Sequence, residues 1–200
     1  MRHKGISKEE TRQKIIAAVG RGFRSHGYAG IGVDRLAKTA GVTSGAFYSH
    51  FGSKDAAFDM ALSAGLDEVI EAIPMHQKEY GADWVKAFAE YYLSKQHRDD
   101  LELGCAMAAL TPEVVRCGQS VQSAFENKMI QIADLISLGL AGSSVEDRRA
   151  RAWAMLSVLI GGINVARAMK GNKVAEEVAF ATITGAIKAA GRTRSRPHSS

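Results

Sequence analysis

A sharp turn between two short helical segments limits what this chain can fold into. Residues 33–40 read V-D-R-L-A-K-T-A and end at Gly41, which lacks a Cβ atom and permits a tight turn. In the stretch that follows, residues 42–54, Phe47 and Phe51 stand four positions apart and share one helix face. When that face packs inward, small and polar residues turn outward. Two helices so arranged form a helix-turn-helix, whose second helix can enter a DNA major groove.

The remainder of the chain has the periodicity and composition of an all-α protein. No long segment alternates with the period of two that a strand requires, and only three prolines occur in 200 residues. Residues that favour helices, such as alanine, leucine, lysine and glutamate, are common. We therefore expect a three-helix N-terminal unit and a helical body, about nine helices in all. They are expected at about residues 7–27, 33–40, within 42–53, 54–73, 83–97, 103–110, 111–140, 144–169 and 174–190.

Capping residues and prolines set several of these boundaries. Ser7 and Glu10 match a capping box, in which each side chain accepts a hydrogen bond from a free backbone N–H at the helix start. Pro74 is expected to end the fourth helix, with a loop after it, because proline disrupts a helix interior. Thr111 followed by Pro112 is expected to start a helix, with Thr as the cap and Pro in the first turn.

Charge divides the chain into three parts. Residues 1–56 hold ten Lys or Arg and four Asp or Glu, residues 57–187 hold twelve and seventeen, and residues 188–200 hold four and none. A basic front segment on an acidic body is typical of a DNA-binding head joined to a regulatory body, although solvated surface helices alone also produce such a charge pattern. We expect a DNA-binding domain at 1–53, an effector-binding and dimerisation domain at 54–190, and a disordered basic tail at 191–200.

Several classes of protein are disfavoured. Every long apolar segment is interrupted by charged residues, and the basic N-terminus leads to no apolar signal segment, so we expect a cytoplasmic protein without membrane contact. Cys105 and Cys117 are too few for a disulfide framework and lack the spacing of a zinc site. We expect no metal and no cofactor. No nucleophile–base pair or phosphate loop is evident, so we expect no catalytic site and no enzyme.

At this point the residues resemble a known family. The block from Gly27 to Phe58 reads G-Y-A-G-I-G-V-D-R-L-A-K-T-A-G-V-T-S-G-A-F-Y-S-H-F-G-S-K-D-A-A-F. It resembles the DNA-binding domain of the tetracycline-repressor (TetR) family of bacterial transcriptional regulators. The resemblance is strong over about the first 60 residues, and the rest matches only in layout. One departure is Ile31-Gly32, where the family often has Thr or Ser, so a phosphate contact usual at that place is in doubt.

The resemblance implies contacts to double-stranded operator DNA. Lys54 stands at a helix N-terminus and is implied to bind a backbone phosphate, with Tyr48 and His50 as further backbone contacts. Ordinary packing or a solvated surface is the alternative for each of these three. Small residues at the start of the second helix of the motif are placed to approach base edges. The predicted DNA contacts are Thr43, Ser44, Gly45, Tyr48, His50 and Lys54.

The last two helices are implied to form a four-helix interface in a homodimer, because a single recognition helix reads only a few base pairs. Two consecutive glycines, Gly161 and Gly162, weaken the first of these helices, and close approach of another helix would explain them. The alternative is that both helices close the core of a single chain. The predicted interface residues are Leu159, Gly162, Ile163, Ala166, Phe180, Ile183 and Ile187.

Aromatic and methionine side chains in the body suit a pocket for an apolar or aromatic effector. Each of them is as readily explained as ordinary core. A buried Asn164 requires a hydrogen-bond partner, which an effector or its twin in a dimer would supply. The predicted pocket residues are Trp84, Phe88, Tyr91, Tyr92, Met107, Phe125, Met129, Trp153 and Asn164.

The main hypothesis is therefore a homodimeric repressor that releases a palindromic operator when a small molecule binds the body. An alternative within the same fold is a thiol-based sensor of oxidants or electrophiles that uses Cys105 or Cys117. The sequence G-C-A-M places Cys105 near the presumed pocket. More distant alternatives are a small-molecule-binding protein or an enzyme using the helical body, and an architectural protein that binds DNA without regard to sequence. The sequence names neither the effector nor the operator.

Overall fold

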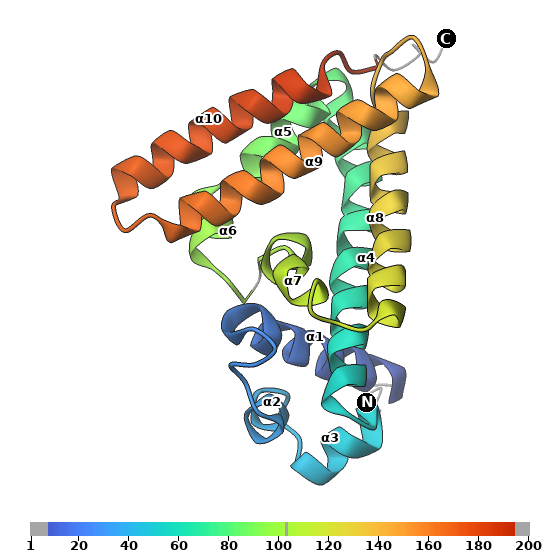
Figure 1. The fold of residues 1–200 in the computed structure, drawn as a ribbon, viewed down its shortest axis with the longest axis vertical. Helices are drawn as coiled ribbons and strands as arrows, with labels where there is room; N and C mark the ends of the chain where they lie inside the picture. Colours follow the sequence, from blue (N-terminus) through green and yellow to red (C-terminus); the bar gives the residue numbers. More distant parts are fainter. Residues whose placement is uncertain (1–7, 103, 195–200) are drawn as a thin grey trace, which may run out of the picture.

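The computed structural model describes residues 8–102 and 104–194, and over these residues the chain is all-α (Figure 1). The expected fold class is confirmed, although the helices are divided differently from the prediction. The elements are α1 (Lys8–His26), α2 (Val33–Thr39), α3 (Ser44–Phe51), α4 (Lys54–Tyr80), the 3-10 turn η1 (Gly81–Asp83), α5 (Trp84–Tyr92), α6 (Lys95–Asp99), α7 (Ala106–Val114), α8 (Gln119–Leu138), α9 (Val145–Ala168) and α10 (Asn172–Ala190). The Ser7 capping box lies outside the described residues.

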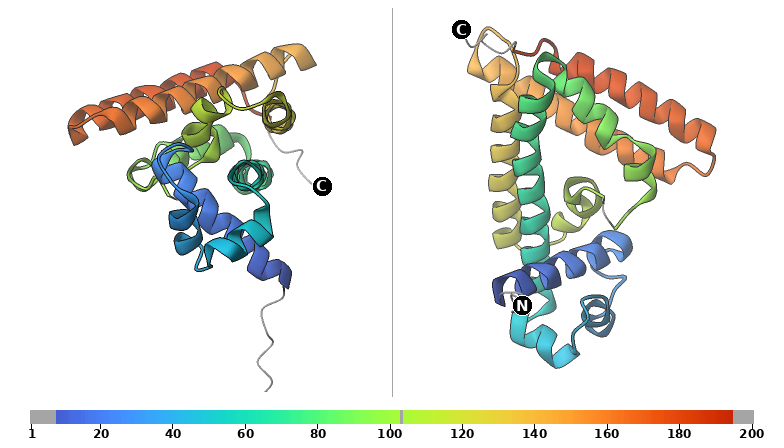
Figure 2. Two further views of the ribbon diagram at one scale, coloured as in Figure 1. Left: turned by 60° about the horizontal axis from the view of Figure 1, so that its bottom comes forward. Right: turned by 180° about the vertical axis from the view of Figure 1, so that it is seen from behind.

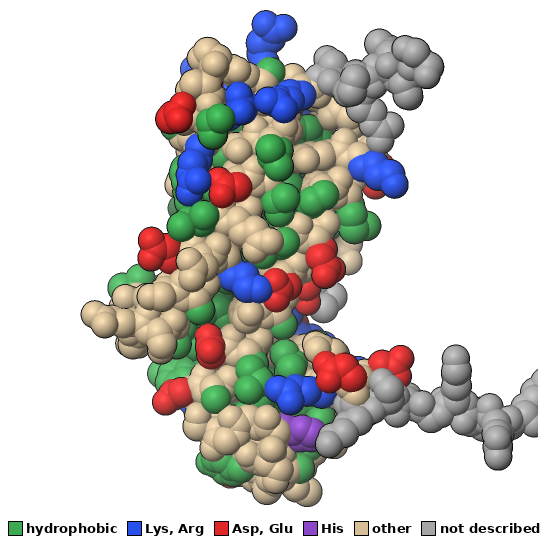
Figure 3. All heavy atoms as spheres, turned by 90° about the vertical axis from the view of Figure 1, so that its right-hand side faces the viewer, with side chains coloured by type: hydrophobic (Ala, Val, Ile, Leu, Met, Phe, Trp, Pro, Cys, Tyr) green, Lys and Arg blue, Asp and Glu red, His purple; other side chains and the backbone are tan. Residues whose placement is uncertain are grey.

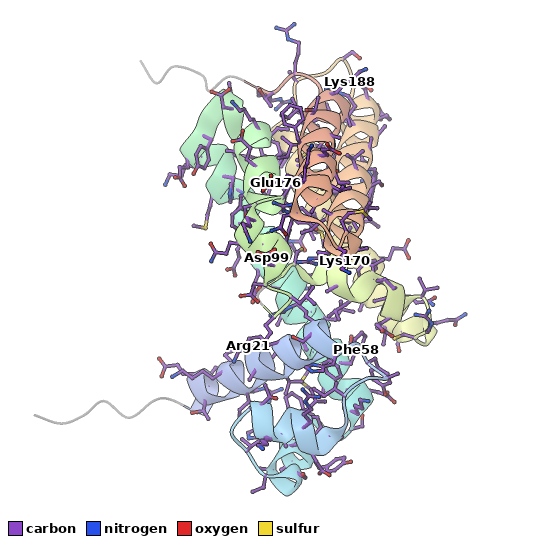
Figure 4. The ribbon with its side chains drawn as sticks, turned by 90° about the vertical axis from the view of Figure 1, so that its left-hand side faces the viewer. Arg21, Phe58, Asp99, Lys170, Glu176 and Lys188 are labelled. Atoms are coloured by element: carbon purple, nitrogen blue, oxygen red, sulfur yellow. The ribbon has the colours of Figure 1, made fainter. Side chains whose placement is uncertain are left out.

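Helices α1 to α3 and the start of α4 form a small head at one end of the molecule (Figures 1 and 4). Its core is aromatic. The rings of Phe23 in α1 and Phe58 in α4 meet edge to face, with centroids 5.2 Å apart, and Phe47 and Phe51 of α3 lie 4.8 Å apart. All four side chains are buried. Edge-to-face and tilted pairs are favoured arrangements for rings. The first contact holds α1 against α4, and the second lies within the buried face of α3, which packs on α2 and α4.

Helix α4 joins the head to the body. It contacts α1 near its start and runs beside α8 along most of its length (Figures 1 and 2). The expected end at Pro74 is wrong, because α4 continues to Tyr80 with Pro74 inside it. Tertiary contacts on both sides of the proline hold the last turns. Ile73, just before it, is fully buried, and beyond it the Gln77 side chain donates a hydrogen bond to the Leu135 carbonyl of α8 at 2.8 Å. Such contacts outweigh the local cost of the proline.

The predicted helix start at Thr111-Pro112 is also wrong. Both residues lie near the end of α7, and the next helix begins at Gln119 after Gly118. Pro112 has no N–H to donate to the carbonyl of Ala108, four residues earlier. The side-chain amide of Asn164 in α9 donates to that carbonyl instead, at 3.2 Å. A side chain distant in sequence therefore supplies the hydrogen bond that the proline removes.

The expected helix at 83–97 is divided in two, because the chain turns at Leu93 and Ser94. The Ser94 hydroxyl then caps α6 by accepting a hydrogen bond from the His97 N–H at 3.2 Å. This turn directs His97 back toward α5, where its ring centroid lies 5.1 Å from that of Tyr92. A single uninterrupted helix would not bring these two rings together in this way.

Helices α9 and α10 lie side by side and antiparallel across the body (Figures 1 and 2). A Cβ atom at Gly162 would lie 2.2 Å from the Thr182 side chain of α10, so glycine is required there for close packing. The expected close approach of a helix is confirmed at this position, and the helix belongs to the same chain. At Gly161 a Cβ would meet nothing within 4 Å.

The tail prediction is wrong at its start and lies outside the described residues from 195 onward. Thr193 forms an isolated antiparallel bridge with Leu140, and the Ala141 N–H donates to the Arg192 carbonyl at 2.8 Å. The Thr193 hydroxyl also donates to the Ala82 carbonyl at 2.6 Å. Backbone pairing with the α8–α9 connection orders these residues despite their polar composition.

The outer surface of the body carries mixed charges. The face on the α8 side shows Lys, Arg, Asp and Glu side chains interspersed with hydrophobic ones (Figure 3). Within residues 8–102 and 104–194, every helix falls short of the length and apolar character needed to cross a membrane.

Candidate nucleic-acid interface and body cavity

Helix α3 presents one buried and one exposed face. Phe47 and Phe51 are buried, as predicted, and Gly45, Tyr48 and Ser49 are exposed. Tyr48 is 52% exposed although it is a large aromatic residue, and its ring meets Phe47 edge to face. An aromatic ring held on a rigid support with its hydroxyl in solvent suits contact with a phosphate.

The two polar residues at the start of α3 are partly engaged within the head. The Thr43 hydroxyl caps α3 by accepting a hydrogen bond from the Ala46 N–H at 3.1 Å. The Ser44 hydroxyl donates to the carboxylate of Asp34 in α2 at 2.6 Å. Asp34 was not predicted as a partner of Ser44, although an acidic residue in the first turn of α2 could have indicated such a role. To contact a base edge, the Ser44 hydroxyl must either break its hydrogen bond to Asp34 or accept a hydrogen bond from the base while it donates to Asp34.

Gly45 occupies open space. A Cβ atom placed there would meet only the Thr43 hydroxyl, at 3.9 Å, and its backbone has ordinary helical geometry without a positive φ. Among residues 8–102 and 104–194, neither packing nor backbone conformation therefore requires glycine at this exposed position. The close approach of another molecule to the backbone of α3 is a physical reason for glycine at this position.

Lys54, the first residue of α4, is held by Tyr28 in the α1–α2 turn. Its ammonium donates to the Tyr28 carbonyl at 2.6 Å and lies 4.3 Å from the centre of the Tyr28 ring. The Tyr28 hydroxyl donates in turn to Asp55, and this bond is the main cause that raises the pKa of Tyr28 to about 12. An ammonium has three N–H donors, so Lys54 keeps donors for a phosphate. The resemblance pointed to Tyr28 only as a fixed aromatic residue.

His50 is half-buried in the last turn of α3, with its ring centroid 6.4 Å from that of Phe51. Two basic residues that the prediction left out, Arg35 and Lys38, are exposed on α2. The structure thus brings Tyr48, His50 and Lys54 to the same small head as the exposed basic residues of α2. Such a surface supplies the positive charge and the donors that phosphates require.

The body contains a cavity of about 80 Å³ between α4, α5, α6 and the segment before α7, here called the body cavity. Three predicted pocket residues, Phe88, Tyr91 and Tyr92, line it, and Cys105 lies beside them as the sequence suggested. His97 also lines it and was missed, because the break before α6 was not foreseen. The walls of the body cavity are formed by Gly65, Glu68, Val69, Ala72, Phe88, Tyr91, Tyr92, His97, Gly104 and Cys105.

The other predicted pocket residues do not line this cavity. The Trp84 indole donates to the Gly139 carbonyl at 3.2 Å, which ties α5 to the end of α8. Asn164 is exposed, and its side-chain amide donates hydrogen bonds to the carbonyls of Ala108 and Ile160. The rest belong to the core or pack on its edge: Met107, Phe125, Met129 and Trp153.

A second, polar hollow of about 240 Å³ lies where α6 meets the α9–α10 turn. Asp99 of α6 and Glu176 of α10, both labelled in Figure 4, are among its walls, together with Arg98 and Arg167. Lys95 and Asp99 form an ion pair at its edge. Charges of both signs surround this hollow.

The predicted interface residues separate into two groups. Leu159, Ile163 and Ala166 are buried within the chain, and Gly162 packs on Thr182. Ile183 and Ile187 are partly buried. Phe180 is 75% exposed, and Val165 and Val174 are also exposed on the same pair of helices. With Val145 at the start of α9, which is 58% exposed, four large apolar side chains are therefore exposed on α9 and α10.

Known proteins resemble this chain in both sequence and fold. The family profile described as "Bacterial regulatory proteins, tetR family" matches residues 15–60. The HTH-type transcriptional repressor AcnR of Corynebacterium efficiens is 36% identical over 110 residues, which cover 49% of this chain and 56% of that protein. The chain thus spans about half the length of this curated relative. The HTH-type transcriptional repressor NemR of Escherichia coli K12 is 26% identical over 139 residues, 67% of this chain and 69% of that protein.

Solved structures share the fold over nearly the whole chain. A TetR-family transcriptional regulator from Cytophaga hutchinsonii superposes with a TM-score of 0.75 at 18% identity, covering 96% of this chain and 100% of that one. The reduced form of Escherichia coli NemR gives a TM-score of 0.71 at 18% identity, covering 94% and 100%. At these identities the likeness establishes the fold of head and body together.

Proposed function

We propose that this chain, which belongs to the tetR family of bacterial regulatory proteins, is a transcriptional regulator that binds operator DNA through α3 and the start of α4. Its first role is to bind DNA, and the proposal assigns it no catalytic step. A regulator of this kind acts in the cytoplasm, where the chromosome is accessible. The relatives named as repressors favour repression over activation.

The observation that carries the proposal is the exposed face of α3. Gly45 is a glycine within a helix, where it lowers helix stability, and no contact among the described residues requires it. It lies one helical turn before the exposed Tyr48 and Ser49. Close approach of a base edge or phosphate to the α3 backbone would require a residue without a side chain at this position. Tyr48 and Lys54 would then fix the position of the helix on the DNA backbone.

We propose a homodimer formed through the outer surfaces of α9 and α10. The exposed apolar side chains Phe180, Val165 and Val174 supply a surface that a second copy would bury. Twofold symmetry presents two copies of α3 to one DNA duplex, so the operator is expected to be palindromic. Partly buried Ile183 and Ile187 extend this surface along α10.

We propose that a small molecule bound in the body cavity controls DNA affinity. The cavity borders α4 through Gly65, Val69 and Ala72, and the same helix carries Lys54 at its first position. A ligand that binds more tightly to a state with a different α4 position shifts the population toward that state. This difference in ligand affinity between the two states is what lowers the affinity of the protein for operator DNA. By linkage, bound operator lowers the affinity for the ligand by the same factor.

The thiol-sensor alternative finds less support. Cys105 is buried, and burial raises the pKa of its thiol, which leaves little thiolate at neutral pH. Burial also raises the pKa of Cys117, with Asp55 and Glu113 adding to the effect. A redox-sensing thiol requires the opposite environment, in which the thiolate is stabilised and accessible.

The deciding experiment is selection and sequencing of DNA bound by the purified protein from a random pool. We expect a palindrome whose half-sites are separated by one helical turn or a multiple of it. Gly45→Ala is expected to fold and to bind the selected DNA less tightly, because the added methyl group faces the duplex. An unselective pool, with equal affinity for the enriched and scrambled sequences, would identify an architectural DNA-binding protein and contradict the proposal.

A further inference from the structure

Two serine hydroxyls of α3 donate their protons to groups within the head. The Ser44 hydroxyl donates to the Asp34 carboxylate at 2.6 Å, and the Ser49 hydroxyl donates to the Gly45 carbonyl at 3.0 Å. The direction of both bonds is fixed, because an ionised carboxylate and a carbonyl oxygen can only accept. A hydroxyl has a single proton, so each serine keeps only its oxygen lone pairs for another molecule.

Ser44 occupies the part of α3 that is best placed to reach a base edge. It is the first residue of the helix, directly after the N-cap Thr43, and its side chain is partly exposed. In a helix-turn-helix, the N-terminal residues of the second helix contact base edges in the major groove. A base that approaches Ser44 while its bond to Asp34 persists therefore meets an acceptor and not a donor.

Asp34 places a second acceptor beside Ser44. Its side chain in the first turn of α2 is exposed, and among residues 8–102 and 104–194 no Lys, Arg or His forms an ion pair with it. Its neighbours Arg35 and Lys38 on α2 are basic and exposed. A carboxylate on a surface that meets DNA is repelled by the phosphates. Such a group is favourable there where a donor of the DNA binds it.

Few base edges offer a donor in the major groove. Cytosine presents its N4 amino group and adenine its N6 amino group, whereas guanine and thymine present acceptors. Adenine also carries the N7 acceptor next to its amino group, and N7 would repel a second acceptor oxygen. Cytosine has no acceptor on this edge, so it fits two neighbouring acceptors better than adenine does.

We propose that Ser44 Oγ and the Asp34 carboxylate form an acceptor pair that binds the N4 amino group of a cytosine in each half-site of the operator. The inference rests on the proposed function, because it names the base that α3 recognises. Asp34 is then a specificity-determining residue, since it holds the Ser44 proton and also offers its own lone pairs. One N–H of the amino group lies outside the base pair, and either oxygen, or both in a bifurcated bond, accepts it.

The contacted base pair is located by selection. Wild type and Ser44→Ala each select DNA from the same random pool, and the position at which Ser44→Ala loses its preference is the one that Ser44 contacts. We expect one such position in each half-site, occupied by cytosine paired with guanine in the wild-type selection. An adenine–thymine pair at that position, or no position that changes, would overturn the proposal.

Two modified base pairs at that position then test which group is recognised. The pairs 5-methylcytosine–guanine and thymine–diaminopurine share the C5 methyl group, the minor-groove amino group and the number of pairing hydrogen bonds. In the major groove, the N4 amino donor of the first is replaced by the O4 acceptor of the second. We expect anisotropy titrations to show the 5-methylcytosine duplex binding at least about fivefold more tightly, as one net hydrogen bond provides. Equal affinities, or tighter binding of the diaminopurine duplex, would contradict the acceptor pair.

Asp34→Asn distinguishes recognition of cytosine from recognition of its partner guanine. An asparagine amide offers a donor and no longer fixes the direction of the Ser44 hydroxyl, so we expect the ratio of the two affinities to fall toward one. If Ser44 donated to guanine instead, loss of the carboxylate would free its proton, and the ratio would rise or stay the same. That result would overturn the assignment. The ratio is the readout because loss of a negative charge raises the affinity for both duplexes.

Ser49→Ala is the matched control for these variants. It removes a hydroxyl from the same exposed surface of α3, one helical turn further along. We expect it to leave the affinity ratio at the Ser44 base pair unchanged. A ratio that falls as far in Ser49→Ala as in Asp34→Asn would assign the preference to the helix as a whole and contradict the role of Asp34.

The bond between Ser44 and Asp34 is also measurable without DNA. The Hα–Hβ scalar couplings of Ser44 report its χ1 angle, and a hydroxyl held by Asp34 gives the couplings of a single rotamer. We expect such couplings in the full-length wild type and averaged values in Asp34→Ala. Averaged couplings in the wild type would remove the premise of the proposal.

Failure of this inference is separable from failure of the proposed function. A wild-type protein that enriches no sequence contradicts operator binding itself. A protein that enriches a palindrome but binds the two modified duplexes equally contradicts only the roles given to Ser44 and Asp34. The rotamer of Ser44 is measured on the protein alone and does not depend on either result.

Discussion

Lys54 is positioned by a residue that makes no predicted DNA contact. Tyr28 offers its carbonyl and its ring to the ammonium, while its hydroxyl is directed to Asp55. Tyr28 is itself fixed by its stacked contact with Phe23, at 6.0 Å between centroids, and by Phe58. The aromatic core of the head therefore determines where the charge of Lys54, which we propose binds a phosphate, lies. Neither the sequence spacing nor the charge pattern indicates this arrangement, because it depends on the close approach of two turns.

We expect Lys54→Gln to weaken operator binding and to lessen its dependence on salt. Glutamine can still donate to the Tyr28 carbonyl, so the substitution removes charge more than structure. The slope of log affinity against log salt concentration should decrease by about one for each bound subunit, because fewer counterions are released. Fluorescence anisotropy at several salt concentrations measures it. Lys86→Gln, an exposed change in α5 far from the head, is the control and should leave the slope unchanged.

The two cysteines are expected to react slowly in the folded protein. Because burial raises the pKa of Cys105, its thiolate fraction at pH 7 is below that of an ordinary thiol, and access is closed as well. Iodoacetamide should label the half-buried Cys117 before Cys105, and both should react rapidly in guanidinium chloride. Mass spectrometry over time follows both sites. Rapid native labelling of Cys105 at pH 7 would restore the thiol-sensor alternative.

At the level of helices, local signals predicted the head better than the body. The spacing of Phe47 and Phe51 and the turn at Gly41 predicted α2 and α3 because these elements are short and their signals are local. In the body, the helix boundaries predicted from Pro74 and Pro112 are wrong, because hydrogen bonds from the side chains of Gln77 and Asn164 stabilise the helices around these prolines. Such contacts join residues more than fifty positions apart and leave no periodic trace in the sequence. His97 was missed for a local reason, because the break between α5 and α6 at Leu93 and Ser94 was not foreseen.

The packing of α9 on α10 is expected to depend on Gly162. In Gly162→Ala the added methyl group would overlap the Thr182 side chain, so we expect a loss of about 1–3 kcal/mol in the free energy of unfolding. Gly45→Ala is the matched control, since its methyl group meets open space and alanine favours a helix by up to about 1 kcal/mol. Urea denaturation compares the two. Equal stability of Gly162→Ala and wild type would contradict the close approach.

For the molecule as a whole, we propose that the outer surface of α9 and α10 determines the state of association. We expect Phe180→Glu to convert a dimer to monomers, because it places a charge on an apolar surface that the partner buries. Sedimentation velocity measures the mass, and operator affinity should fall with dimerisation. Val115→Glu is the control: Val115 is 72% exposed at the end of α7, away from this surface. Dissociation by both substitutions, or by neither, would place the interface elsewhere.

The uninterrupted course of α4 past Pro74 has a geometric consequence. A helix of 27 residues is about 40 Å long, since each residue adds 1.5 Å. Gln77 anchors one end to α8, whereas Lys54 occupies the other. If that anchor acts as a pivot, tilting the rod by about 5° displaces the far tip by roughly 3 Å, which is comparable to a hydrogen-bond length. A lever of this length lets an adjustment too small to disturb the core carry the Lys54 ammonium out of reach of the phosphate that we propose it binds.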